Sequence, residues 1–457
     1  MKLKKILHLF SLLKLLLLLV LVTMKTFNLI ILFNLIFNIF IINNVSIAAT
    51  DTSYFLHVTD IHYDIHYDPG SPNNCIIGTK TGMGCCRKDE LPLDPYYSCS
   101  KWGDFNCDNP TYLNERIFSW IANSTRTKEG IPPLDFIIYT GDSPGHHLPS
   151  QSVERNIECM YNISQIIDHY FPKIPLYQSL GNHDTYPIDQ TMDITYDRIL
   201  ANASSVWSKW LSVEALRNAR IGGYYSVKLN FLGNGIRLIS FNSIYYDKDN
   251  LFGIKNDTAE KKSGYQWLWL EGELEKIKEN NEKFIFINHI PPGTHEANDY
   301  YNGRLINLLA KYQEYIIVQL YGHTHEDRFM LHKVNNNYTG YTLIPGSLMT
   351  AHHDPSFRIY AYDKNNKMIK DYRQYSCSLR DTIKSDKVLC NNTYNFTTEY
   401  KMNSLSLNSM IKLYNQIKTN SSDTASKYIK HYYPGANHTA CDTQCLKNYV
   451  DEIVVSV

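Results

Sequence analysis

The chain lacks an excess of charge of either sign, because its 45 lysines and arginines balance its 45 aspartates and glutamates. A nucleic-acid binder that is held by phosphate neutralisation needs a clustered cationic surface, so this balance argues against nucleic acid as a partner. The chain also lacks an internal repeat and a glycine loop that could cradle a nucleotide. Hydrophobic residues make up 44% of the 457 residues, which is enough for a buried core.

No Cys-x-x-Cys pair occurs, which argues against a structural zinc site built from thiolates. The ten cysteines lie in local groups, and such groups in an exported protein are typical of a disulfide framework. Proximity pairs Cys377 with Cys390 and Cys441 with Cys445. The pairing of the remaining cysteines stays open; these are Cys75, Cys85, Cys86, Cys99, Cys107 and Cys159.

The first 49 residues differ in composition from the rest of the chain. Lysines at positions 2, 4 and 5 precede an apolar stretch over 6–22, and a second apolar run covers 27–42. Small residues at positions 46, 48 and 49 then form the pattern that signal peptidase cleaves. We expect residues 1–49 to be a cleaved signal peptide. The alternative is a membrane anchor, since either apolar run approaches the length that spans a bilayer.

Asn-x-Ser/Thr sequons are frequent after this leader. So many sequons in an exported chain predict a surface that carries N-glycans. We therefore expect a secreted protein or a protein of a lysosome-like compartment. The sequons begin at Asn123, Asn162, Asn202, Asn256, Asn337, Asn391, Asn395, Asn420 and Asn437.

Short apolar runs alternate with amphipathic segments past the leader, which indicates an α/β domain. The expected strands cover 54–59, 136–139, 173–180, 238–242, 284–288 and 316–321. The expected helices cover 115–122, 151–169 and 266–279. Residues 64–110 are rich in Gly, Pro, Asn and Cys, and this composition predicts a cross-linked insertion with little regular structure.

Polar segments follow five of the expected strands, where open α/β sheets usually place their sites. The segments are Asp60-Ile61-His62, Gly141-Asp142, Gly181-Asn182-His183-Asp184, Asn288-His289 and Gly322-His323-Thr324-His325. Residues two apart on an extended chain point to the same side, so Asp60 and His62 can converge on one ion. Imidazole and carboxylate ligands without thiolate suit zinc, manganese or iron better than calcium. Each segment alone is weak evidence, but the five together predict a metal centre.

This series of motifs resembles the calcineurin-like metallophosphoesterase superfamily over residues 54–375. More narrowly, it resembles the acid sphingomyelinase and acid sphingomyelinase-like phosphodiesterase family. The narrower resemblance rests on Gly-Asp-Ser-Pro-Gly-His at 141–146, on Asn-His-Ile-Pro-Pro-Gly at 288–293, on Asp-Pro-Ser-Phe-Arg at 354–358 and on the cysteine-rich insertion. It implies a four-layer α/β/β/α sandwich. We expect a catalytic domain over 50–375, with the insertion at 64–110, and a disulfide-linked helical extension over 376–457.

The resemblance also implies a centre of two zinc ions. One ion would be held by Asp60, His62, Asp142 and His325, and the other by Asp142, Asn182, His289 and His323, so that Asp142 is the bridge. Two such ions share a water, lower its pKa and neutralise charge on the phosphoryl oxygens in the transition state. Gly145 stands where purple acid phosphatases carry an iron-binding tyrosine, which argues against a tyrosinate-iron site.

The leaving oxygen needs a proton, and two histidines are candidate donors. His183 is the first candidate, because it directly follows a predicted ligand. His146 is the second, because it matches a histidine four residues after the bridging aspartate in the sphingomyelinases. The ordinary histidine pKa near 6.5 suits this task. Asp184 is expected either to orient His183 or to cap a helix.

The resemblance implies a secreted zinc phosphodiesterase that hydrolyses sphingomyelin or a related phosphodiester, with peripheral contact to lipid. Full acid sphingomyelinase carries a saposin domain before the first motif, and only residues 50–59 separate the leader from Asp60 here. A secreted nucleotide phosphodiesterase that acts on nucleoside triphosphates or phosphocholine-linked nucleotides therefore remains an alternative. An inactive secreted binding glycoprotein is a third interpretation, and the intact ligand set counts against it.

Overall fold

The computed structural model describes residues 51–77, 80–81, 83–93, 97–127, 130–191, 197–255, 261–419, 423–435 and 441–457. The expected leader lies outside the described residues, as do the sequons at Asn256, Asn420 and Asn437. Within the described part of the chain, no helix has the length and apolar character needed to cross a membrane. Residues Thr52–Val457 form one structural unit.

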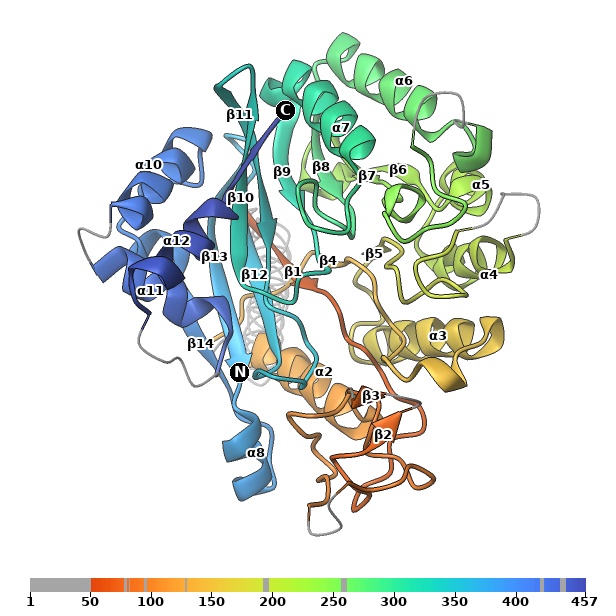
Figure 1. The fold of residues 1–457 in the computed structure, drawn as a ribbon. Helices are drawn as coiled ribbons and strands as arrows, with labels where there is room; N and C mark the ends of the chain where they lie inside the picture. The colour runs from red at the N-terminus through yellow and green to blue at the C-terminus, as the bar shows by residue number, and fades with distance from the viewer. Residues whose placement is uncertain are drawn as a thin grey trace, which may run out of the picture. The chain divides into compact units, whose positions relative to one another are not determined.

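Two β-sheets form the centre of this unit (Figure 1). The first has the strand order β14-β13-β12-β1-β4-β5, and the second has the order β15-β10-β11-β9-β8-β7-β6. The strands of the first sheet are β1 Thr52–Val58, β4 Phe136–Tyr139, β5 Leu176–Gln178, β12 Ser356–Asp363, β13 Met368–Cys377 and β14 Cys390–Asn395. The strands of the second sheet are β6 Tyr225–Lys228, β7 Ile236–Ser240, β8 Lys283–Ile287, β9 Ile316–Leu320, β10 Arg328–Val334, β11 Asn337–Ile344 and β15 Val454–Ser456.

Each sheet buries both of its faces. Successive side chains on a strand point to opposite sides of the sheet, and here the side chains on both sides lie in a core. On β4, Phe136 joins the core between the sheets, whereas Ile137 joins the core under the outer helices of the first sheet. On β8, Ile285 faces the core between the sheets and Phe284 faces the outer helices of the second sheet. The layers therefore run α/β/β/α, and the expected fold class is confirmed.

Four helices supply the outer layers (Figure 1). They are α2 Thr111–Arg126 and α3 Val153–Tyr170 on the first sheet, and α6 Gln266–Glu279 and α7 Asp299–Lys311 on the second. Side-chain caps begin two of them: Ser152 accepts the Arg155 N–H before α3, and Asn298 accepts the Tyr301 N–H before α7. The three helices and six strands expected from the sequence are confirmed, with shifts of a few residues at their ends.

Two shorter helices, α4 Arg198–Val206 and α5 Val213–Gly222, lie between β5 and β6 in the chain. The C-terminal segment contains α8 Leu379–Ser385, α9 Phe396–Glu399, α10 Leu407–Lys418, α11 Asp423–Tyr432 and α12 Thr443–Asp451. This segment is not only helical, since β14 adds to the first sheet and β15 adds to the second. The expected domain boundaries stay a prediction.

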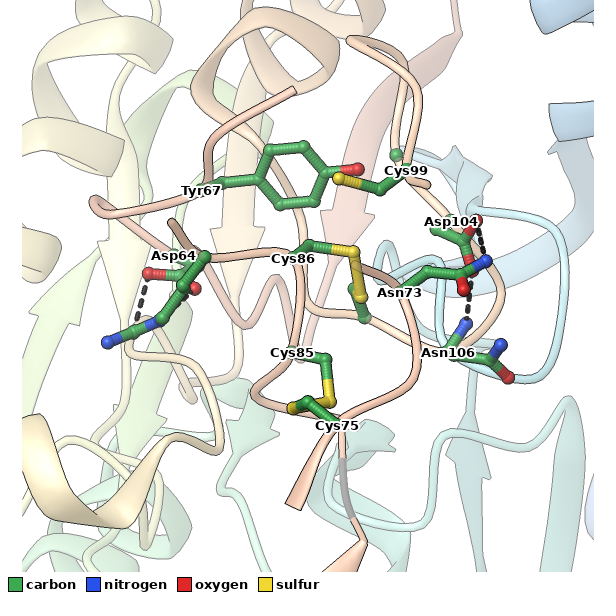
Figure 2. Close-up of a disulfide and its surroundings, with 12 residues drawn as sticks. Asp64, Tyr67, Asn73, Cys75, Cys85, Cys86, Cys99, Asp104 and Asn106 are labelled. Atoms are coloured by element: carbon green, nitrogen blue, oxygen red, sulfur yellow. Dashed lines mark hydrogen bonds and ion pairs between the residues drawn. A yellow bond between two sulfur atoms is a disulfide. The ribbon is translucent and has the colours of Figure 1, made fainter. Parts of the chain in front are cut away.

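The cysteine-rich insertion has little regular structure, as expected, and its described strands are the short pair β2 Ile76–Ile77 and β3 Lys80–Thr81. Two disulfides cross-link it, Cys75–Cys85 and Cys86–Cys107 (Figure 2). The expected C-terminal pairs, Cys377–Cys390 and Cys441–Cys445, are confirmed. The disulfide framework does not take in every cysteine, because Cys99 and Cys159 are buried free thiols.

Candidate dinuclear metal centre

The predicted ligands lie at the carboxyl ends of parallel strands from both sheets. In the first sheet β1, β4 and β5 run parallel, and Asp60, Asp142 and Asn182 follow these three strands. In the second sheet β8 and β9 run parallel, and His289 and His323 follow them. Since carboxyl ends of parallel strands meet at one edge of a sheet, the topology gathers residues that are far apart in the sequence.

One group of potential ligand atoms lies within 4.8 Å of one another and comprises Asp60, His62, Asp142 and His325. His62 Nε2 is 3.0 Å from His325 Nε2 and 3.6 Å from Asp142 Oδ2. His325 Nε2 is 3.3 Å from Asp60 Oδ1. The four side chains are those predicted to hold the first ion, and their donor atoms converge on one point.

A second group with the same spacing comprises Asp142, His289 and His323. Asn182 belongs beside it, because its Oδ1 lies 2.9 Å from His289 Nε2 and 3.1 Å from His323 Nδ1. Asp142 Oδ2 is 3.3 Å from His289 Nε2. The same carboxylate oxygen thus faces histidines of both groups, which is the position that a bridging ligand needs.

The chemistry of these donors fits a pair of divalent cations. Asp60 and Asp142 are 0% and 1% exposed, and buried carboxylates without compensating charge are costly. Burial acts to raise the pKa of Asp142, but the His289 and His183 rings hold it well below its ordinary value. Burial acts to lower the pKa of His289, but Asp142 raises it to about 9. Imidazole nitrogen with carboxylate and amide oxygen is a donor set that suits zinc or a related transition metal.

Backbone carbonyls orient two of the histidines. His62 Nδ1 lies 3.1 Å from the Pro144 carbonyl, and His289 Nδ1 lies 2.6 Å from the Thr140 carbonyl. A carbonyl oxygen only accepts, so Nδ1 carries the hydrogen in each ring and the lone pair is on Nε2. This is the arrangement that holds metal-ligating histidines in the correct tautomer.

The ligand loops have an unusual backbone. Asp60, His62, Asp142, His323 and His325 have φ values of 49°, 45°, 63°, 75° and 63°. Only a few per cent of non-glycine residues adopt this left-handed conformation, and such residues cluster at functional sites. Hydrogen bonds help to hold it: the His323 N–H donates to the Asp60 carboxylate at 2.9 Å. The protein therefore fixes its ligand loops in a strained geometry.

The two candidate proton donors lie beside the first group. The His62 ring centroid is 4.0 Å from that of His146 and 4.9 Å from that of His183. Burial lowers the pKa of His183 to about 3, and its Nδ1 has no hydrogen-bond partner within the described part of the chain. Burial acts in the same direction on His146, but Asp108 raises its pKa above the ordinary value. Within the described residues, Nδ1 of His146 therefore has a carboxylate partner and Nδ1 of His183 has none.

Asp184 has a different environment from the one expected. Its carboxylate accepts the backbone N–H groups of Gly181 at 2.8 Å, of Asp142 at 3.0 Å and of Ser143 at 2.9 Å. The described hydrogen bonds of Asp184 include none to the His183 ring, and no helix begins beside it, since α4 starts at Arg198. Asp184 instead joins the loop that carries Asp142 to the loop that carries Asn182.

Sequence reasoning missed three carboxylates that contact predicted site residues. Asp108 pairs with His146 at 2.6 Å, Asp189 accepts from Asn182 Nδ2 at 2.8 Å, and Glu296 Oε2 lies 3.4 Å from His323 Nε2. The bond from Asp189 fixes the amide so that the Asn182 oxygen faces the two histidines. None of the three belongs to a motif at the end of a strand, so no local pattern distinguishes them.

The chain is similar in sequence to known proteins over most of its length. The model of the calcineurin-like phosphoesterase family matches residues 53–327, and that of the acid sphingomyelin phosphodiesterase C-terminal region matches residues 332–455. Sphingomyelin phosphodiesterase A of Dictyostelium discoideum is 31% identical over 88% of this chain, which spans 66% of that relative. Cyclic GMP-AMP phosphodiesterase SMPDL3A of Mus musculus is 29% identical over 87% of this chain and 88% of its own length. Sphingomyelinase phosphodiesterase C of Dictyostelium discoideum is 28% identical over 92% of this chain and 94% of its own length.

Proposed function

Because the chain belongs to the calcineurin-like phosphoesterases and continues into an acid sphingomyelin phosphodiesterase C-terminal region, we propose that it is a secreted zinc phosphodiesterase. Its proposed substrate is sphingomyelin or a related phosphodiester. The observation that supports this best is the position of Asp142 Oδ2, which faces His62 at 3.6 Å and His289 at 3.3 Å. A single carboxylate oxygen between two sets of ligands is what a two-metal hydrolase requires.

In this proposal the predicted metal ligands keep their roles. Asp60, His62, Asp142 and His325 hold one zinc ion, and Asp142, Asn182, His289 and His323 hold the other. When bound, the metal pair supplies an activated water and stabilises charge on the phosphoryl oxygens. His146 and His183, which lie against His62, are the groups available to protonate the leaving oxygen.

Export from the cell is part of the proposal. Four disulfides are typical of an oxidising compartment, either outside the cell or in a lysosome-like organelle. Sequon asparagines at positions 123, 337 and 391 are exposed and so accessible to N-glycosylation. Peripheral contact with lipid follows from a sphingomyelin substrate and is proposed with it.

A nucleotide phosphodiesterase is the second candidate function. It is favoured by one relative that matches this chain over nearly its whole length and is named for hydrolysis of cyclic GMP-AMP. The same metal centre would serve both substrates, because the reacting group in each is a phosphodiester. The two candidates therefore differ in the surroundings of the site and not in its ligands.

Product analysis distinguishes the candidates. The purified secreted protein is incubated separately with sphingomyelin micelles, ATP and cyclic GMP-AMP, and zinc is measured in each preparation. His289→Ala is the inactive blank, and His169→Ala, a change of an exposed residue of α3, is the matched active control. The lipid candidate is supported if the wild type and His169→Ala both release phosphocholine and ceramide and His289→Ala releases neither. Nucleotide products with intact sphingomyelin support the second, and a protein that retains two zinc ions but cleaves none of the three contradicts both.

A further inference from the structure

A carboxylate from the cysteine-rich insertion reaches one of the two histidines beside the metal ligands. Asp108 Oδ1 lies 2.6 Å from His146 Nδ1, and Asp108 Oδ2 accepts the backbone N–H of His146 at 2.6 Å. The carboxylate is fully buried and the imidazole is 17% exposed. One carboxylate therefore holds both the backbone and the ring of His146, and Nε2 is the ring nitrogen that remains available to the site.

Gly145 makes this close approach feasible. A Cβ atom at position 145 would lie 2.6 Å from Asp108 Oδ2 and 2.9 Å from its carboxyl carbon. Contacts below 3.0 Å force a displacement, so a side chain here would push the carboxylate away from His146. Glycine thus provides the space that the contact between Asp108 and His146 requires.

The insertion holds Asp108 in place from several directions. Asp108 follows Cys107, whose disulfide to Cys86 lies in the middle of the insertion (Figure 2). The Asp108 N–H donates to the Met83 carbonyl at 3.0 Å. Arg87 anchors the start of the insertion, since it donates to both Asp64 oxygens at 2.6 Å, and Asp64 lies two residues after His62. Asp108 is therefore attached to a cross-linked framework that is itself tied to the loop of a metal ligand.

We infer that Asp108 is a positioning residue that holds His146 as the proton donor to the leaving oxygen; this inference rests on the proposed phosphodiesterase function. In that step the N–H bond at His146 Nε2 breaks and the O–H bond of the leaving alcohol forms, while the bond from phosphorus to that oxygen breaks and the oxygen of the attacking water bonds to phosphorus. The hydrogen at Nδ1 stays in its bond to Asp108. His183 is the weaker candidate, because its Nδ1 has no partner within the described residues that would fix its ring.

A series of aryl phosphodiesters tests this role in the full-length, zinc-loaded protein. A leaving group that needs no proton, such as 4-nitrophenolate, is insensitive to loss of a general acid, whereas a poor leaving group is sensitive. We expect Asp108→Asn to lower kcat by about 10- to 100-fold for unsubstituted phenol as leaving group. For 4-nitrophenol the decrease should be less than about threefold, so that kcat depends more steeply on leaving-group basicity.

Two further variants separate positioning from general damage to the insertion. Gly145→Ala retains the carboxylate but displaces it, and it should produce the same steeper dependence. Asp104→Asn is the matched control, because Asp104 bonds to Asn73 and Asn106 within the insertion and not to His146 (Figure 2). Asp104→Asn should leave the dependence of kcat on leaving-group basicity unchanged.

A uniform decrease for every leaving group in Asp108→Asn would overturn the inference, and so would loss of zinc in both Asp108→Asn and Gly145→Ala. In the second case Asp108 would act on the metal ligands themselves. A zinc-loaded wild-type protein that hydrolyses no phosphodiester would instead remove the proposed function, which makes the two failures distinguishable.

Discussion

His332 couples the stability of the fold to pH through burial of a single imidazole. It lies on β10, is 2% exposed, and its Nε2 is 3.0 Å from the Thr342 hydroxyl. Burial lowers its pKa from 6.5 to about 4. Between pH 6.5 and pH 4 the unfolded chain binds a proton at this position and the folded chain does not. The stability that His332 contributes is therefore complete above pH 6.5 and is lost as the pH falls through this window.

We expect His332→Gln to reduce this dependence on pH. At neutral pH the variant should be less stable than the wild type, because the substitution disturbs a packed position. On acidification to pH 4 the difference in unfolding free energy should shrink by about 3 kcal/mol, which is the shift in pKa converted to energy. Urea unfolding at several pH values measures it. His169→Gln, at an exposed position, is the control, and equal pH slopes in wild type and His332→Gln would contradict the prediction.

Asp184 offers a second test at a single side chain, because its carboxylate carries three backbone N–H groups. Asp184→Ala leaves these buried donors without an acceptor, which costs about 1–3 kcal/mol each. We expect the unfolding free energy to fall by about 3 kcal/mol or more, and bound metal to be lost with it, since both joined loops carry candidate ligands. Calorimetry and metal analysis measure the two effects. Unchanged stability with loss of turnover alone would favour the orienting role toward His183.

The two sheets are joined by an ion pair that is closed to solvent. Arg358 of β12 donates to Asp327, just before β10, at 2.5 Å, and Tyr394 of β14 donates to the other Asp327 oxygen at 2.7 Å. The side chains of Arg358 and Asp327 are 0% and 4% exposed. Asp327 lies two residues after His325, so this contact also restrains the loop of a candidate ligand.

We expect Arg358→Ala to destabilise the protein by about 3–5 kcal/mol, because it leaves a buried carboxylate without its partner. The double variant Arg358→Met with Asp327→Leu should recover most of this loss, since an apolar pair of similar volume leaves no buried charge. Chemical unfolding of the single and double variants measures the coupling. A double variant no more stable than Arg358→Ala would show that packing, and not the unpaired charge, accounts for the loss.

Across the whole chain, eight cysteines are cross-linked and two are not. Cys99 is 4% exposed and Cys159 is 0% exposed, and burial raises the pKa of both thiols, that of Cys159 to about 12. Thiolate is the reactive form, so both should be inert in the folded protein. We expect a thiol reagent to label none of the cysteines under native conditions and two per chain after unfolding without reductant. Cys159→Ser should lower this count to one, and a count of zero would show that the two thiols are oxidised.

The C-terminal segment shows where local patterns in the sequence are insufficient. Its helices have clear amphipathic spacing, but its strand β14 has the polar composition of a loop and its strand β15 is only three residues long. Each forms a strand by pairing with the edge of a sheet: β14 pairs with β13 of the first sheet, and β15 pairs with β10 of the second. Pairing at an edge depends on a neighbour distant in the sequence, so propensity alone does not predict it.

The candidate metal ligands could be proposed from the sequence because each lies in a short motif directly after an apolar strand. No segment alone is sufficient, but Asp60, Asn182 and His323 each follow an expected strand, and open α/β sheets place their sites at such strand ends. The α/β character of the domain follows from the alternation of apolar runs with amphipathic segments, whereas the four layers were expected from the family resemblance. The two C-terminal disulfides could also be predicted, because the two cysteines of each pair lie close together in the sequence and few other cysteines are near them.

Only the tertiary structure decided which groups support these ligands. The Nε2 atoms of His62 and His325 lie 3.0 Å apart although the two residues are 263 positions apart in the sequence. The motif of each histidine predicts that residue separately and does not predict the contact. Asp108 and Asp189 have no such motif, and the motif of Asp184 does not reveal its partners, since these carboxylates acquire a role only through the hydrogen donors that folding brings to them. The pairing of the N-terminal cysteines was undecided for the same reason. A local pattern records what a residue is able to bind, whereas its partner is set by the path of the rest of the chain.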